Sequence, residues 1–368
     1  MNEKNNLFKK ALELAENLSY KVSPRPPVAA IVSYKGEVIG EGVTTIDPLI
    51  HAEVNAINAA QEKLKSLKDC VLYTTLEPCF HTGNTGPCVD RIIESGLKKI
   101  IIGSVDPNPK VNKKSINKLK NNKTDVELID DHNLKKRSDN LIEPFKMYIK
   151  NSLPFLTAKM AISLDGKIAT KTGDSKWISS EKSREIVQDM RSESDAIIIG
   201  SKTLEIDKPS LNARNRTLQP KIKAVVKSNP KMFSEVESLL NENTSQIIIY
   251  CHKKPDNYES WDNITFVEIR KKDGNLDLTM ILKDLSDRGC INVLMEGGGK
   301  LLGSLIDLNL VNKVRLFISP MLIGGESSTD SIGGDGIEFI SQSKKLTDIE
   351  VKIIESDIMV TGLIKDHV

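Results

Sequence analysis

Hydrophobic and polar residues follow two rhythms along the first part of the chain, one typical of helices and one typical of short strands. Residues 7–18 place Leu7, Leu14 and Leu18 on one stripe, which predicts an amphipathic helix. Strands and helices then alternate, which favours a sheet covered by helices on both faces, an α/β/α layer. The predicted elements are helices at 7–18, at 51–64 and from about 88, and strands at 28–32, 71–75 and 100–103.

Polar and charged residues dominate 121–140, and a second pattern of strands and helices starts at Pro154. We place a domain boundary between residues 146 and 153, so that the chain divides into residues 1–148 and 149–368. The second part is again predicted to be α/β. Its predicted strands lie at 155–160, 196–199, 224–226, 246–250 and 292–295, and its predicted helices at 181–192, 277–287 and 300–309.

The amino-acid composition is typical of a globular protein and gives no indication of binding to nucleic acid or membranes. The 368 residues are 39% hydrophobic, and 52 basic against 50 acidic residues give a net charge of +2. A lysine cluster between Lys110 and Lys123 is the local exception, either a solvated helix face or a basic patch. No apolar signal core follows the first residues and no apolar run is long enough to cross a bilayer, so we expect a cytoplasmic protein.

The five cysteines include two that stand in a metal-binding pattern. His51, Cys79 and Cys88 offer three ligands that suit zinc and leave a fourth corner of the tetrahedron open for water, as in a catalytic site. Glu53 lies two positions after His51, where its carboxylate can shuttle a proton from water to a leaving amine. The alternatives are a structural zinc site with His81 as a fourth ligand, or unrelated cysteines near a core histidine.

A strand, a glycine turn and a helix follow one another late in the chain. The predicted strand at 292–295 leads into Glu296, the glycines at 297–299 and a helix that starts at Lys300. Such a unit lets backbone amides approach a diphosphate at the helix N-terminus. It lacks the spacing of the Rossmann fingerprint, so a Rossmann fold is not predicted, and it remains open whether this is only a tight turn.

The wider zinc motif resembles one protein family closely. Residues 75–88 read Thr-Leu-Glu-Pro-Cys-Phe-His-Thr-Gly-Asn-Thr-Gly-Pro-Cys, and Asp-Pro-Asn-Pro follows at 106–109. The distance between the two cysteines departs from the short gap of cytidine and tRNA deaminases and is similar to the riboflavin-pathway deaminase. The resemblance covers about residues 7–128. It implies a cytidine-deaminase-like α/β/α domain, with zinc held by His51, Cys79 and Cys88 and with Glu53 as the catalytic residue.

The second half resembles the riboflavin-pathway reductase over about residues 154–365. Pro-Phe at 154–155, Ser-Leu-Asp-Gly-Lys at 163–167 and Ser-Lys-Trp-Ile at 175–178 carry this resemblance. It implies a dihydrofolate-reductase-like α/β domain. The two families in this order are similar to the bifunctional deaminase–reductases of riboflavin biosynthesis, so the resemblance implies zinc-dependent deamination of 2,5-diamino-6-ribosylamino-4(3H)-pyrimidinone 5′-phosphate and then reduction of its ribose by NADPH. It also implies homo-oligomers that associate through the reductase domain.

The same resemblance implies a set of binding residues in the second domain. Arg191 and Arg214 carry forked cations that suit a phosphate, and Trp177 offers a flat face for stacking, although surface arginines and a core tryptophan are the plain alternatives. We assign no catalytic acid here, because hydride transfer needs alignment rather than a covalent catalyst. The implied NADP contacts are Ala161, Trp177, Thr203, Asp207, Ser228, Gly298, Gly299, Lys300, Leu301, Leu302, Gly303 and Ser304, and the implied substrate contacts are Ser175, Arg191, Leu211, Arg214 and Glu296.

Several positions depart from the two family patterns. In the reductase half, Lys208 stands where the family has an aspartate, and Lys227 replaces an aspartate before Ser228. The departures in the deaminase half leave open a chain in which only the reductase half is active. A nucleic-acid-binding module built on the lysine cluster is a further alternative, which would leave the second half without a role. The departures in the deaminase half are Arg25, Ala29, Thr44, Pro48, Lys113 and Ser115.

Overall fold

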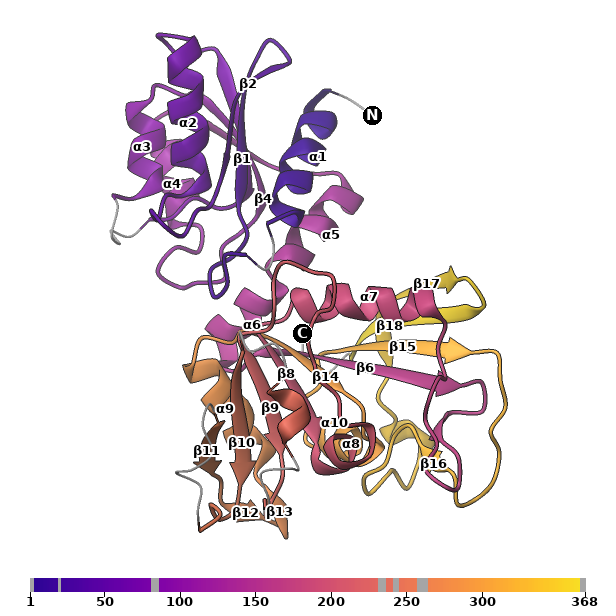
Figure 1. The fold of residues 1–368 in the computed structure, drawn as a ribbon. Helices are drawn as coiled ribbons and strands as arrows, with labels where there is room; N and C mark the ends of the chain where they lie inside the picture. Colours follow the sequence, from indigo (N-terminus) through magenta and orange to yellow (C-terminus); the bar gives the residue numbers. More distant parts are fainter. Residues whose placement is uncertain are drawn as a thin grey trace. The chain divides into compact units, whose positions relative to one another are not determined.

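The protein, seen in a computed structural model, folds into two compact units, Met1–Ser152 and Leu153–Val368 (Figure 1). No helix among the described residues has the length and apolar character that crossing a bilayer requires. The structure describes residues 3–18, 21–80, 86–230, 236–240, 245–256 and 264–364.

The first unit is built on a mixed five-stranded sheet in the order β2-β1-β3-β4-β5. The pairs β1–β2 and β1–β3 are antiparallel, whereas β3–β4 and β4–β5 are parallel. The carboxyl ends of the parallel strands therefore meet at one edge, where loops are free to carry functional side chains. The strands are β1 (Ala29–Tyr34), β2 (Glu37–Val43), β3 (Cys70–Leu76), β4 (Lys99–Ser104) and β5 (Asp125–Leu128).

Helices cover both faces of this sheet, so the predicted α/β/α layering is confirmed (Figure 1). On one face lie α2 (Ala52–Lys63), α3 (Cys88–Glu94) and α4 (Lys114–Asn121), and on the other lie α1 (Glu3–Glu16) and α5 (His132–Leu141). A final helix, α6 (Glu143–Asn151), ends the unit.

Close packing of α2 on β2 explains two glycines of that strand. A Cβ added at Gly40 would lie 2.2 Å from the Ala56 carbonyl oxygen, and one at Gly42 would lie 2.2 Å from that of Ala52. Helix α2, which begins directly after His51, therefore packs closely against β2, and this contact fixes the position of His51 relative to the sheet.

The second unit contains a nine-stranded sheet in the order β11-β10-β9-β8-β14-β6-β15-β18-β17. The strands from β11 to β15 are parallel, and β18 and β17 add an antiparallel edge. The strands are β6 (Phe155–Ser163), β8 (Ala196–Gly200), β9 (Ile222–Val226), β10 (Gln246–Cys251), β11 (Ile264–Glu268), β14 (Asn292–Glu296), β15 (Lys313–Ser319), β17 (Leu346–Ile354) and β18 (Asp357–Ile364).

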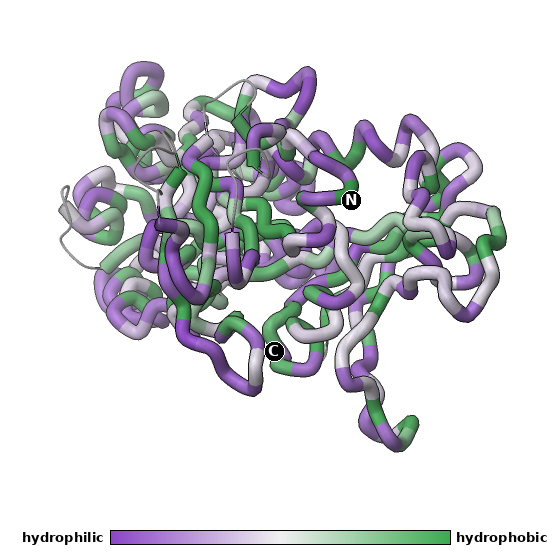
Figure 2. The backbone as a smooth tube through the Cα atoms, turned by 60° about the horizontal axis from the view of Figure 1, so that its bottom comes forward, coloured by the Kyte–Doolittle hydropathy of each residue, from purple (hydrophilic) through white to green (hydrophobic). Residues whose placement is uncertain are grey.

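Two hydrophobic cores lie on the two faces of this larger sheet. One core packs α9 (Leu278–Asp287) and α10 (Gly299–Asp307) against it, and the other packs α7 (Glu181–Ser192) and α8 (Ser201–Asp207). Figure 2 colours the backbone by hydropathy, and apolar and polar segments alternate along it. Two small ribbons complete the unit: β7 (Lys167–Ala169) with β16 (Thr329–Asp330), and β12 (Lys271–Lys272) with β13 (Asn275–Leu276).

The polar stretch at 121–140, for which no element was predicted, carries β5 and most of α5. These elements produce no clear periodicity of hydrophobic residues in the sequence. Strand β5 is a half-exposed edge strand, and the buried residues of α5 are only Leu134 and Ser138. Strands β15, β17 and β18 were likewise not predicted. Strand β17 turns most of its side chains outward, so no buried face marks it in the sequence.

Candidate functional site

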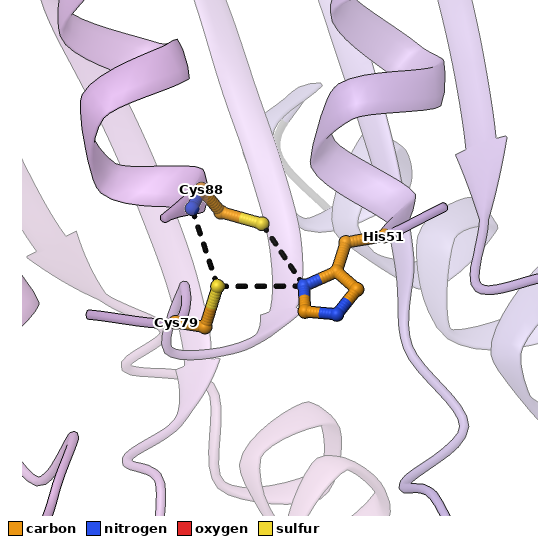
Figure 3. A group of neighbouring side chains, drawn as sticks. All are labelled: His51, Cys79 and Cys88. Carbon is orange, nitrogen blue, oxygen red and sulfur yellow. Dashed lines mark hydrogen bonds between the residues drawn. The ribbon is translucent and has the colours of Figure 1, made fainter. Parts of the chain in front are cut away.

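His51, Cys79 and Cys88 come together in the first unit (Figure 3). His51 is the residue before α2, Cys88 is the first residue of α3, and Cys79 lies on the loop after β3. The His51 Nδ1 atom is 3.1 Å from the Cys88 sulfur and 3.4 Å from the Cys79 sulfur, and the Cys88 amide donates to the Cys79 sulfur at 3.2 Å. Three separate segments of the chain thus place one nitrogen and two sulfur atoms close together.

This arrangement fits a zinc ion. The three ligand atoms lie within 4.8 Å of one another, with His51 and Cys79 partly exposed and Cys88 buried. Around a tetrahedral zinc with bonds of about 2.0–2.3 Å, neighbouring ligand atoms lie about 3.5–3.8 Å apart. The observed spacings need little adjustment to reach that geometry. Two helix N-termini at His51 and Cys88 add a favourable field for thiolate ligands.

Glu53 lies beside the cluster in the first turn of α2, with only 4% of its surface exposed. Burial raises the pKa of its carboxyl to about 7, and the nearby Cys79 sulfur adds to the rise. A hydrogen bond from Cys88 lowers the pKa of Cys79 to about 4, which favours the thiolate form that metals bind. The Glu53 carboxyl therefore lies buried beside the three ligand atoms, with a raised pKa.

The loop that carries Cys79 is tied to α4 and to the segment before it. The Ser115 hydroxyl donates to the Pro78 carbonyl oxygen at 2.6 Å, and the buried Glu77 carboxylate accepts from the amides of Asp106 and Lys113. Two departures from the family pattern, Lys113 and Ser115, are thus accommodated. Lys113 adopts φ 57°, the left-handed conformation that glycine adopts most easily, and Ser115 supplies an anchoring hydrogen bond.

His81, the alternative fourth ligand, lies outside the described residues, as does the rest of 81–85. Within the part of the chain that the structure describes, the group of His, Cys, Asp and Glu side chains arranged to hold a metal consists of His51, Cys79 and Cys88. These residues form a three-ligand set, which the sequence pattern predicted for a catalytic site.

The second unit contains a cavity of about 1140 Å³ along the carboxyl edge of its parallel strands. The middle of β6 and the ends of β8, β9 and β14 line it, together with residues of α7, α8 and α10. This is where α/β sheets place their ligands, because loops and helix N-termini converge at that edge. The volume exceeds the needs of one small molecule and accommodates a dinucleotide beside a substrate.

Arg191 and Glu296 form a buried pair at one end of the cavity. The arginine Nε and Nη2 atoms donate to the two carboxylate oxygens at 2.7 and 2.9 Å, and Nη1 donates to the Asn212 carbonyl at 3.0 Å. Burial opposes ionisation of Glu296, but Arg191 lowers its pKa overall. The Arg191 guanidinium therefore already donates its hydrogen bonds to protein groups. The sequence did not predict this pairing.

Most of the residues implied as NADP or substrate contacts do line this cavity. The exceptions among the described residues are Leu302 and Gly303. Leu302 is fully buried in the core under α10, and a Cβ added at Gly303 would lie 2.1 Å from the backbone of Gly333. The implied residues that line the cavity are Ala161, Trp177, Thr203, Asp207, Ser228, Gly298, Gly299, Lys300, Leu301, Ser304, Ser175, Arg191, Leu211, Arg214 and Glu296.

The glycine turn before α10 has the form of a phosphate cradle. Gly297 and Gly298 both have positive φ, 66° and 67°, and Gly298 is the residue before the helix. A Cβ added at Gly297 would lie 2.8 Å from the Thr203 methyl group, so a side chain there is excluded. The residues that begin this nine-residue helix line the cavity, and a glycine turn before a helix N-terminus fits the diphosphate of a dinucleotide.

Three residues at the cavity were not predicted as site residues. Lys159 is a half-buried cation within β6, where a charge in an apolar strand was a usable signal, and desolvation lowers its pKa. The Arg184 guanidinium lies 4.7 Å from the centre of the Trp177 ring, which is 65% exposed and so is not a core tryptophan. Glu205 accepts a hydrogen bond from Lys227 at 2.6 Å, and sequence spacing gave no sign of that pair.

Comparison with protein families divides the chain in the same order. Residues 1–104 match the cytidine and deoxycytidylate deaminase zinc-binding region, and residues 154–360 match the RibD C-terminal domain. The riboflavin biosynthesis protein RibD of Actinobacillus pleuropneumoniae is 32% identical over 96% of this chain and 93% of its own length.

Solved structures agree over almost the whole chain. A diaminohydroxyphosphoribosylaminopyrimidine deaminase/5-amino-6-(5-phosphoribosylamino)uracil reductase from Thermotoga maritima is 30% identical, with a TM-score of 0.84 and coverage of 98% of this chain and 99% of that one. The RibD structure of Acinetobacter baumannii is 27% identical, with a TM-score of 0.83 and coverage of 99% of each chain. The chain therefore belongs to the RibD family of riboflavin biosynthesis enzymes, in which a zinc-binding deaminase domain precedes a reductase domain.

Proposed function

We propose that residues 1–148 deaminate 2,5-diamino-6-ribosylamino-4(3H)-pyrimidinone 5′-phosphate and that residues 149–368 then reduce the ribosyl group of the product with NADPH. The convergence of His51, Cys79 and Cys88 beside a buried Glu53 carries the first half of the proposal. The cavity with its glycine turn supports the second half. The solved relative from Thermotoga maritima is named for the same pair of activities.

In the deaminase domain, His51, Cys79 and Cys88 would hold the metal and Glu53 would move the proton. Zinc, when bound, makes water nucleophilic near neutral pH. The Glu53 carboxylate would accept a proton from the attacking water and return it to the departing amino nitrogen. A carboxyl whose pKa lies near 7 suits both transfers, because it gains and loses a proton at little cost near neutrality.

In the reductase domain the side chains bind and orient rather than react covalently. NADPH, when bound, supplies the hydride. The glycine turn would receive its diphosphate, and the exposed Trp177 ring, held by Arg184, offers a stacking face. Arg214 is exposed at the cavity and suits the substrate phosphate, whereas Arg191 would act on the substrate through Glu296, which it holds in place.

A chain active only in its reductase half receives no support from the deaminase domain. All three metal ligands converge, and the altered residues Ala29 and Ser115 form ordinary hydrogen bonds there, with Thr75 and Pro78 respectively. We therefore retain both activities in the proposal.

We also propose that the chain works in the cytoplasm on small molecules, as a homo-oligomer joined through the reductase domain. The edge strand β17 presents Ile349, Val351 and Ile353 on one face, with 59%, 58% and 69% of their surfaces exposed. Such a row on an open sheet edge favours pairing with another chain. The near-neutral net charge of +2 gives no reason to expect a nucleic-acid partner.

Turnover of the phosphorylated diaminopyrimidinone by the full chain tests the proposal. Without NADPH, we expect one ammonia per substrate and accumulation of the deaminated ribosylamino product. Addition of NADPH should then consume one equivalent as the ribityl product forms. Removal of zinc by a chelator should stop ammonia release but leave reduction of the isolated deaminated product. Ammonia release by the metal-free protein, or no NADPH consumption with the deaminated product, would contradict the proposal.

A further inference from the structure

One end of the reductase cavity contains an ion pair to which the proposed reaction assigns no role. Lys227 and Ser228 directly follow β9, and Glu205 lies on α8, on the cavity wall beside them. The Lys227 Nζ atom donates to Glu205 Oε1 at 2.6 Å. The lysine side chain is 7% exposed and the glutamate 49%, so a buried ammonium faces a half-exposed carboxylate.

Backbone hydrogen bonds to the neighbouring strand β10 fix the position of Lys227. The Lys227 amide donates to the Tyr250 carbonyl at 3.0 Å, and the Ser228 carbonyl accepts from the His252 amide at 2.9 Å. Pairing between the two neighbouring segments thus continues two residues beyond β9 itself. A buried ammonium requires an anionic partner, because desolvation of an unpaired charge is costly.

The order of strands separates the ion pair from the substrate end by two strand spacings. The sheet runs β9, β8, β14, and the Arg191–Glu296 pair lies at the end of β14, about 10 Å from β9 at the usual strand spacing. The cradle at Gly297 and Gly298 touches Thr203, which is on the same helix as Glu205 and two residues before it. A path along the cavity therefore runs from Glu296 past the glycines to Lys227.

This inference rests on the proposed reductase function. A dinucleotide whose nicotinamide lies at the substrate end, with its diphosphate on the glycine turn, directs its adenosine ribose toward the end of β9. NADPH differs from NADH by a phosphate on the 2′ position of that ribose. A phosphate monoester carries a charge of about −1.5 to −2 near pH 7 and three acceptor oxygens. That group is a stronger partner for a buried ammonium than one half-exposed carboxylate.

We propose that Lys227 and Glu205 determine which nicotinamide dinucleotide the enzyme prefers, with Lys227 binding the 2′-phosphate and Glu205 opposing it. Glu205 competes with the phosphate for the same ammonium and repels it by like charge. A carboxylate in this place is also suited to accept a hydrogen bond from the 2′-hydroxyl of NADH. The two residues therefore act in opposite directions, and the balance between them sets the preference.

Calorimetric titration of the full-length protein with NADP⁺ and with NAD⁺ tests the proposal. Lys227→Gln should weaken NADP⁺ binding by about tenfold or more, the usual effect of losing a hydrogen bond to a charged group, while NAD⁺ binding changes by less than about twofold. Lys227→Arg keeps the cation and should retain NADP⁺ binding within about threefold. Glu205→Gln should shift the two affinities in opposite senses, with NADP⁺ binding tighter and NAD⁺ binding weaker.

A matched control lies at the other end of β9. Lys221 directly precedes this strand and pairs with Asp195 at 2.9 Å, so Lys221→Gln removes a lysine from an ion pair at the amino ends of the parallel strands, away from the cavity. It should leave the ratio of NADP⁺ to NAD⁺ affinity unchanged. Circular dichroism and urea unfolding of each variant separate a folding defect from a change in selectivity. Because Glu205→Gln removes the carboxylate beside a buried ammonium, Lys227→Arg, which keeps the ion pair, is the variant expected to be least affected in stability.

The outcomes separate this inference from the function on which it rests. If wild-type protein binds NADP⁺ and neither Lys227→Gln nor Glu205→Gln changes the affinity ratio, the selectivity role is wrong and the reductase assignment stands. An equal loss of both nucleotides in Lys227→Gln would likewise overturn it in favour of a purely structural lysine. If the wild-type protein binds neither dinucleotide, the reductase proposal fails and the inference fails with it.

Discussion

The two domains build their sites in opposite ways. The deaminase site is a compact cluster in which one nitrogen and two sulfurs lie within 4.8 Å of one another. The reductase site is a cavity of about 1140 Å³ whose walls come from several strands, helices and loops. A metal demands a few fixed ligand types, whereas a dinucleotide and a sugar phosphate accept many surfaces of suitable shape. Substitution of one metal ligand should therefore abolish deamination, whereas substitution of one residue of the cavity should only reduce the rate or affinity of the reductase.

Removal of a metal ligand should have the largest effect. In Cys79→Ser we expect zinc content to fall from one per chain to near zero and ammonia release to fall by at least about 1000-fold, because the metal-activated water is lost. Reduction of the deaminated intermediate should change by less than about twofold, since the reductase is a separate compact unit. Metal analysis and the two assays measure this.

Cys70→Ser is the matched control, because Cys70 is a buried cysteine of the same domain that is not in the cluster. It should keep both zinc and deamination. Full deamination by Cys79→Ser would show that the cluster does not hold the working metal.

Glu53→Gln should come next, because it removes the proton acceptor but leaves the metal ligands. We expect ammonia release to fall by about 10²–10⁴-fold, the usual contribution of general acid–base catalysis, with zinc content unchanged. The exposed Glu62 on the same helix provides the control, and Glu62→Gln should be silent. Loss of zinc together with activity in Glu53→Gln would indicate a structural role instead.

The Arg191–Glu296 pair gives the reductase its clearest test. Arg191→Ala should lower the free energy of unfolding of that domain by about 3–5 kcal/mol, because it leaves a buried carboxylate unpaired. It should also raise KM for the deaminated substrate. Arg214→Ala, at an exposed position, should raise KM by about tenfold or more while stability changes by less than about 0.5 kcal/mol.

Urea unfolding and substrate titration distinguish these two arginines. Equal stability of the two variants would contradict a structural role for the pair, and an unchanged KM in Arg214→Ala would contradict its phosphate role.

Ser115→Ala tests whether the metal cluster depends on its supporting loop. Loss of the hydrogen bond to the Pro78 carbonyl should destabilise the deaminase domain by about 1 kcal/mol and weaken zinc binding by a few fold. Ser95→Ala removes another buried hydroxyl, which donates to the Ile92 carbonyl away from the cluster. It should cost similar stability without a change in zinc affinity. Equal zinc affinities in the two variants would show that the cluster does not depend on this anchor.

A small effect of pH is expected in the reductase domain. Asp165 accepts hydrogen bonds from the Ser163 hydroxyl and from the amides of Ile323 and Gly324, and these lower its pKa to about 2. Because the folded pKa lies below the unfolded value of about 3.9, this contribution to stability is present above pH 4 and is lost as the pH falls toward 2. Asp165→Asn should therefore be less stable than wild type at pH 6, and the gap should narrow near pH 2. A gap independent of pH would contradict this assignment.

The sequence predicted the metal cluster well because its chemistry is discrete. Histidine, cysteine and glutamate at those spacings have few alternative uses, and the α/β/α layering followed from clear periodicity. The reductase residues were implied by family resemblance, and their pairing was not visible. Arg191 and Glu296 are 105 positions apart, so nothing local indicates that one engages the other. Leu302 and Gly303 were included as a continuous run, but the helical turn directs them into the core and against Gly333.

Diffraction from zinc-loaded crystals of the full chain, measured at the zinc absorption edge, tests the central claim most directly. We predict one anomalous peak per chain within bonding distance of the His51 nitrogen and the Cys79 and Cys88 sulfurs, about 2.0–2.3 Å away, with solvent in the fourth position. A fourth protein ligand such as His81 in that position, or zinc bound elsewhere, would contradict the account of a catalytic deaminase site.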